Sequence, residues 1–147
     1  MGTASTDGVG DLLAYLADGH DYTWADIGFD PYSPVDYGDL PSIRARYDEV
    51  MRALAVVTDK RSIAAAFTRM ARKRYETMYA KAFLASAEKT ESGRRYRAQL
   101  VSQVEADNVA LGEARCEQYK GMYTTLQKLA DALNAALYTI RQEMKQL

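Results

Sequence analysis

Residues 122–147, MYTTLQKLADALNAALYTIRQEMKQL, carry apolar side chains at helical spacing along their whole length. The apolar positions advance by fours and threes, with a final step of seven, at Met122, Leu126, Leu129, Leu133, Ala136, Ile140 and Leu147. This spacing is close to a heptad seam, the pattern of helices that pack lengthwise. Because no strand pattern or glycine-rich repeat appears elsewhere, the sequence predicts an all-α fold of long antiparallel helices, a coiled-coil-like hairpin or bundle.

The residues upstream of this seam predict two further helices. Ser42 can cap a first helix that starts at Ile43 and runs to about Thr58, and Thr58 or Asp59 can cap a second one that runs to about Lys89. The turn-like residues 90–93 end the second helix, and one long helix is expected from Arg94 to Leu147, weakened locally by two glycines. The apolar positions expected to face the core are Ile43, Tyr47, Val50, Leu54 and Val57 in the first helix, and Ile63, Phe67, Met70, Met78 and Ala82 in the second.

Residues 1–41 differ in composition from the helical domain expected over residues 42–147. Residues 18–41 read DGHDYTWADIGFDPYSPVDYGDLP and hold all three prolines of the chain, so we expect an irregular arm. Five aromatic residues lie in this segment, which is too many for a segment that only keeps the protein in solution. We expect the arm to dock on its own helical domain, on a neighbouring subunit or on a partner protein.

Charge is strongly segregated along the chain although the total is only −1. Residues 1–41 hold eight Asp and no Lys, Arg or Glu, whereas residues 42–147 hold all 19 basic residues against 12 acidic ones. Within residues 60–97 there are 11 Lys and Arg against three Glu, a net of +8. This asymmetry indicates a polyanion partner, an acidic arm that lies on the basic surface, or solvated helix faces without a specific role.

Residues with the chemistry of an active site are nearly absent from the sequence. No phosphate-binding loop, nucleophile elbow or zinc motif is present, and we expect neither an enzyme nor a cofactor or metal site. His20, between Asp18 and Asp21, is interpreted as an exposed loop histidine rather than a metal ligand, and Cys116 as a packed or idle thiol. A single cysteine fits a reducing compartment, and no stretch approaches the roughly 18 apolar residues of a membrane span. We therefore expect a cytoplasmic protein without membrane contact.

Basic residues gather on one side of the predicted second helix. At about 100° per residue, Arg61, Arg69, Arg72 and Lys73 fall within a band of about 120°, roughly opposite the apolar side. Tyrosines lie among these charges, where they could form the edge of a core or stack on unpaired bases while Arg and Lys hold phosphates. We predict a site for single-stranded nucleic acid. Its members are Lys60, Arg61, Arg69, Arg72, Lys73, Arg74, Tyr75, Arg94, Arg95, Tyr96 and Arg97.

A resemblance to a known family rests on two adjoining stretches. YETMYAKAFLASAEKTESGRRYRAQL at residues 75–100 leads into SQVEADNVALGEARCEQYKGMYTTLQKLADALNAALYTIRQEM at residues 102–144. A helix with Tyr, Ala and Lys at helical spacing, a basic turn and a long C-terminal helix together resemble small helical bacteriophage recombination mediators of the UvsY type, over about residues 45–145. The resemblance implies an oligomer in a bacterial host cell. It also implies that the protein binds single-stranded DNA and helps to load a recombinase onto strands covered by single-strand-binding protein.

Two classes of function therefore compete at the level of sequence. The first is a single-stranded-DNA-binding accessory protein of recombination or replication. The second is a helical assembly protein that engages only proteins, such as a packaging adaptor, a tail chaperone or an inhibitor of a host protein. In either case we expect a homo-oligomer, because the C-terminal seam is too long for the first helix to cover. Its predicted interface comprises Met122, Leu126, Leu129, Leu133 and Ile140.

Overall fold

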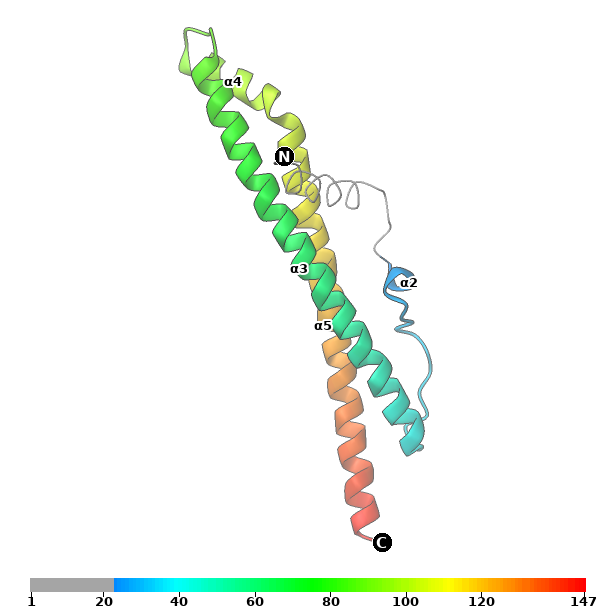
Figure 1. Cartoon of the computed structure of the whole chain (residues 1–147). Helices are drawn as coiled ribbons and strands as arrows, with labels where there is room; N and C mark the ends of the chain where they lie inside the picture. Colours follow the sequence, from blue (N-terminus) through cyan, green and yellow to red (C-terminus); the bar gives the residue numbers. More distant parts are fainter. Residues whose placement is uncertain (1–22) are drawn as a thin grey trace, which may run out of the picture. The chain divides into compact units, whose positions relative to one another are not determined.

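The computed structural model describes residues 23–147 and consists of helices, with an irregular segment over residues 28–39 and shorter connections elsewhere (Figure 1). The helices are α2 (Trp24–Ile27), α3 (Leu40–Ala85), α4 (Glu91–Val101) and α5 (Gln103–Lys145). No strand occurs in this part of the chain, so the predicted all-α class is confirmed. The described residues divide into two compact units. Unit 1 comprises Ser62–Cys116, and unit 2 comprises residues 23–61 together with Glu117–Leu147.

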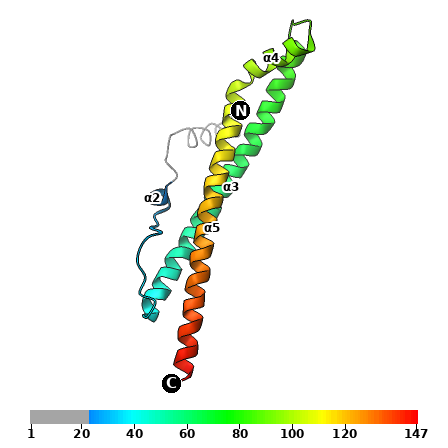
Figure 2. The same ribbon diagram turned by 180° about the vertical axis from the view of Figure 1, so that it is seen from behind.

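Unit 2 is built on a core in which buried side chains recur every seven residues. Ile43, Val50 and Val57 of α3 are each 0% exposed, and Leu126 and Leu133 of α5 are 0% and 1% exposed. Within this unit the two helices run alongside each other in opposite directions (Figures 1 and 2). The apolar face predicted for residues 43–57 and the middle of the C-terminal seam are therefore part of one core, whereas Leu147 at the end of the predicted seam is fully exposed.

The described part of the N-terminal arm belongs to unit 2 and packs on α3. Ile27 and Phe29 are buried, and the Arg46 guanidinium lies 4.5 Å from the centroid of the Phe29 ring. Arg46 also donates a 2.6 Å hydrogen bond from Nη2 to the Asp30 carbonyl and forms a 3.0 Å ion pair with Glu49. The sequence left three docking surfaces open for the arm: its own helical domain, a neighbouring subunit and a partner protein. In the structure, residues 23–39 contact the helical domain of their own chain. The acidic residues 1–22 lie outside the described residues.

The beginning of α3 differs from the sequence-based prediction. Asp39 rather than Ser42 caps the helix, since its Oδ2 accepts from the Ser42 backbone N–H at 3.2 Å. Pro41 lies in the first helical turn, where a backbone N–H has no intrahelical partner to lose. The predicted break near Thr58 is also wrong, because α3 continues through it. The Thr58 hydroxyl donates to the Leu54 carbonyl one turn earlier, at 2.7 Å, instead of capping a new helix.

Unit 1 has a core of small residues around one aromatic ring. Ala64, Phe67 and Ala71 of α3 and Ala98 of α4 are at most 5% exposed. The predicted core positions Ile63, Met70 and Met78 are instead 40%, 39% and 36% exposed, so this part of the prediction is wrong. The face that α3 buries in unit 1 is the one whose alanines let a neighbouring helix approach closely, and not the one that carries the larger Ile63, Met70 and Met78 side chains.

Two interruptions separate α3, α4 and α5 within unit 1. Helix α3 ends at Ala85, and the Thr90 hydroxyl caps α4 by accepting from the Gly93 backbone N–H at 3.0 Å. Between α4 and α5, Ser102 is fully buried, and its Oγ donates to the Ala98 carbonyl at 2.6 Å. Such a bond from a serine to the preceding turn bends a helix, and the single helix predicted from Arg94 to Leu147 is wrong at this point.

Candidate functional site

Basic side chains are concentrated in unit 1. Its described residues hold ten Lys and Arg against six Asp and Glu, a net of +4, whereas the described residues of unit 2 hold nine against ten, a net of −1. Nine of the eleven predicted nucleic-acid-binding residues lie in unit 1. Lys60 and Arg61 belong to unit 2 and are not part of the surface described below.

The outer side of α3 in unit 1 presents three cations, Arg69, Arg72 and Lys73, which we call the α3 basic face. All three side chains are exposed. Arg72 forms a 2.8 Å ion pair with Glu113 of α5, while Arg69 and Lys73 make no ion pair or side-chain hydrogen bond with any residue that the structure describes. One helical turn separates Arg69 from Lys73, which places them about 6 Å apart along the helix axis. Two neighbouring cations without partners are thus held on a regular helix.

Arg74 is not part of the α3 basic face, because at about 100° per residue it lies about 140° around the helix from Arg69 and about 160° from Arg72. It lines a pocket in unit 1 together with Val104 and Glu105 from the beginning of α5. The exposed Arg74 side chain forms no ion pair with the described residues, although a carboxylate lines the same pocket. Glu105 was not among the residues predicted to form a site. No motif marks it, and its position depends on the register between α3 and α5.

A second group of cations, the α4 basic cluster, follows the α3–α4 connection. Arg94 donates from Nε to the Glu88 carbonyl at 3.0 Å, and Arg95 forms a 2.6 Å ion pair with Glu91. Arg97 has no such partner among residues 23–147, and the neighbouring Tyr96 ring is 65% exposed. Arg97 lines a pocket with Ala82 and Ala85, so the α4 basic cluster lies beside the last turns of α3, about 14 Å along that helix from Lys73.

The tyrosines predicted to stack on bases fall into two environments. Tyr75 is half-buried and packs against Tyr79 with ring centroids 6.0 Å apart, and Tyr79 stacks on Phe83 at 6.5 Å. These three residues form a ladder at successive turns of α3 in which each ring packs against the next one. Tyr96, in contrast, is exposed beside the arginines of α4. Stacking on a base is therefore better served by Tyr96 than by Tyr75.

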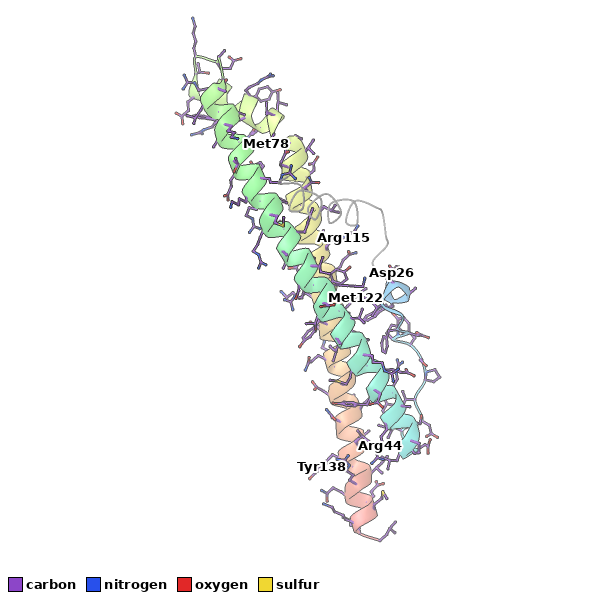
Figure 3. The ribbon with its side chains drawn as sticks, in the orientation of Figure 1. Asp26, Arg44, Met78, Arg115, Met122 and Tyr138 are labelled. Atoms are coloured by element: carbon purple, nitrogen blue, oxygen red, sulfur yellow. The ribbon has the colours of Figure 1, made fainter. Side chains whose placement is uncertain are left out.

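Three of the five residues predicted for the oligomer interface are buried within a single chain. Met122, Leu126 and Leu133 are 9%, 0% and 1% exposed within a single chain, because α3 is long enough to cover the seam. Leu129 and Ile140 are half-buried. On the outer side of the same helix, Tyr138 is 65% exposed and projects away from it (Figure 3). Oligomerisation itself stays a prediction.

The remaining chemical predictions concern single residues. Among residues 23–147 no group of three His, Cys, Asp or Glu side chains is arranged to hold a metal ion, and His20 lies outside the described residues. Cys116 is half-buried, with its sulfur 3.8 Å from the Thr68 hydroxyl oxygen. None of the helices in the described part is both long and apolar enough to span a bilayer.

Comparison of the chain with protein-family models, curated proteins and solved structures finds no match. The resemblance to bacteriophage recombination mediators therefore stays a prediction.

Proposed function

We propose that this protein binds single-stranded nucleic acid through unit 1 and serves as a non-enzymatic accessory protein in recombination or replication. The observation that carries the proposal is the α3 basic face, where Arg69 and Lys73 are exposed and have no partner among the described residues. Cations in this state can neutralise phosphates without first giving up an internal ion pair. The recombination or replication role rests on the resemblance alone.

The α4 basic cluster adds the second element that a single strand requires. Arg97 supplies a cation, and the exposed Tyr96 ring beside it offers a flat surface for an unpaired base. Base–aromatic stacking contributes about 1–3 kcal/mol per base and needs an exposed base face, which a duplex does not present. The proposed preference is therefore for single strands over duplex of the same length.

A titration of labelled oligo(dT) and of a matched duplex at several salt concentrations tests the proposal. The variant Arg69→Ala/Lys73→Ala should bind more weakly, and the slope of log K against log salt should fall by about 1.4, because each lost phosphate contact contributes about 0.7 on a single strand. The matched control is Lys128→Ala/Arg141→Ala, which removes the same two residue types from exposed positions of α5 in unit 2. An unchanged salt slope in the first variant, or no binding of either oligonucleotide at low salt, would contradict the proposal.

A second candidate function is an adaptor that binds only proteins. It is favoured by exposed apolar side chains where α4 meets α5 in unit 1, since Leu100, Val101 and Val104 lie within five residues of the chain and are 51%, 43% and 67% exposed. Exposed apolar groups that lie close together mark protein-binding surfaces. The same titration separates the two candidates, because an adaptor of this kind need not bind oligonucleotides in a salt-dependent way.

A further inference from the structure

A small pocket in unit 1 combines an apolar floor with two opposite charges. It lies between α3 and the beginning of α5 and has a volume of about 210 Å³. Phe67 and Ala71 lie beneath it and are only 1% and 5% exposed, so its accessible apolar lining comes mainly from Met70 and Val104, which are 39% and 67% exposed. A volume below the roughly 300–1,000 Å³ of sites for drug-sized ligands suits a single flat ring system.

The charged groups of this pocket do not satisfy each other. Glu105 is half-buried, and its Oε2 atom is inaccessible to solvent without accepting a hydrogen bond from any residue that the structure describes. Arg74, at the same pocket, is exposed and unpaired in the described part of the chain. Buried polar atoms in proteins nearly always have a hydrogen-bond partner, so the Glu105 carboxylate would gain its missing hydrogen bond by turning toward a donor that enters the pocket.

The pocket therefore presents three features to a ligand. Met70 and Val104 provide an accessible apolar surface for a ring, the Glu105 carboxylate accepts hydrogen bonds but cannot donate them, and Arg74 provides a cation at the edge. The amide of Asn108, which also lines the pocket, can donate or accept. A nucleotide matches this combination, since its base is flat and apolar on its faces, carries N–H donors on its edge and is joined to an anionic phosphate.

We propose that this pocket holds one base of the bound single strand and selects bases that carry an exocyclic amine. The proposal rests on the proposed function and assigns Glu105 as its specificity-determining residue. Cytosine, adenine and guanine each present an NH₂ group that can donate a hydrogen bond to a carboxylate. Thymine and uracil present one N–H between two carbonyl oxygens. These oxygens carry partial negative charge, so a carboxylate repels them. Arg74 contacts the adjoining phosphate, so its contribution is the same for every base.

The test compares oligo(dC), oligo(dA) and oligo(dT) of equal length at neutral pH and fixed salt. The unmodified protein should bind oligo(dC) and oligo(dA) about five- to tenfold more tightly than oligo(dT), the range expected for one well-placed base contact. Glu105→Gln keeps the size of the side chain but adds an N–H donor, and it should bring this ratio close to one. The overall affinity for oligo(dT) should not fall, because the variant removes a negative charge.

Asp107→Asn is the matched control. Asp107 is an exposed carboxylate on the same helix, it accepts from the Gln103 side chain at 2.9 Å, and it does not line the pocket. The substitution removes the same charge, so any general electrostatic gain appears in both variants, and its base preference should equal that of the unmodified protein. Circular dichroism establishes that both variants keep their helix content.

The possible outcomes separate this proposal from the proposed function. If all three oligonucleotides bind equally well in a salt-dependent manner, or if Glu105→Gln leaves the ratio unchanged, the base pocket is wrong while strand binding stands. If no oligonucleotide binds, the proposed function fails, and the base pocket fails with it.

Discussion

Gly112 of α5 packs directly against Thr68 of α3 in unit 1. A Cβ atom at position 112 would collide with the Thr68 hydroxyl oxygen and lie 3.1 Å from Cδ1 of Phe67. Thr68 is itself fixed, because its hydroxyl donates to the Ala64 carbonyl at 2.8 Å. The close approach of the two helices therefore depends on the missing side chain of Gly112 and not on the backbone freedom of glycine.

Replacing Gly112 with Ala should destabilise the protein despite the better helix propensity of alanine. Overpacking of this kind costs about 1–3 kcal/mol, which thermal unfolding followed by circular dichroism would register as a lower Tm. Gly121 is the matched control, since it lies in the same helix and a Cβ there meets nothing within 4 Å. Gly121→Ala should stabilise by up to about 1 kcal/mol. Equal effects of the two substitutions would show that the Gly112 contact is unimportant, whereas partial rescue of Gly112→Ala by Thr68→Ala would support it.

Arg46 should be required for the packing of the N-terminal segment on α3. Its guanidinium contacts the Phe29 ring, the Asp30 carbonyl and Glu49, and the residue is 6% exposed. We expect Arg46→Ala to destabilise the protein by on the order of 3 kcal/mol, because it removes hydrogen bonds from a charged donor at a buried site. Trp24, the single tryptophan, lies 5.7 Å from Phe29, so its fluorescence should change as well. Arg44→Ala, at an exposed position two residues earlier (Figure 3), should have little effect on either signal.

Two N-terminal truncations should have different consequences. A chain that starts at Ser42 lacks Ile27 and Phe29, which are buried, and the Asp39 cap of α3, so its Tm should fall. A chain that starts at Thr23 keeps these contacts and loses four Asp and no Lys or Arg. If the acidic residues 1–22 compete with nucleic acid, this second chain should bind oligo(dT) more tightly at low salt with an unchanged Tm. An unchanged affinity would exclude such competition.

Leu126 should contribute to the stability of the single chain rather than to association. Leu126→Ala removes a side chain that is 0% exposed, and a loss of about 2–5 kcal/mol is expected from the cavity and the lost burial. Tyr138→Ala, at an exposed position on the same helix, serves as the control. Light scattering at micromolar concentration tests the predicted homo-oligomer directly, and an oligomer that Leu126→Ala dissociates without lowering the Tm would contradict the core assignment.

The sequence alone determined the fold class and much of the core of unit 2. Ile43, Val50, Val57, Leu126 and Leu133 are large, apolar and spaced by sevens, so any helix that contains them must bury that face. The exposure of the cations of the α3 basic face could also be predicted, because charged side chains are rarely buried without partners.

The tertiary structure decided the features that depend on how α3 and α5 meet. Thr58 and Asp59 are suitable capping residues, but α3 continues through them because the apolar positions on both sides, Val57 and Ala64, are buried on one face. The burial of Ala64 and Ala71 in place of Met70 follows from the close approach at Gly112, which no local pattern shows. The pocket of Arg74 and Glu105 likewise exists because the register of two helices brings together residues that are 31 positions apart in the chain. Local spacing determines which face of a helix is apolar, but the contacts that place one face against another form between residues far apart in sequence.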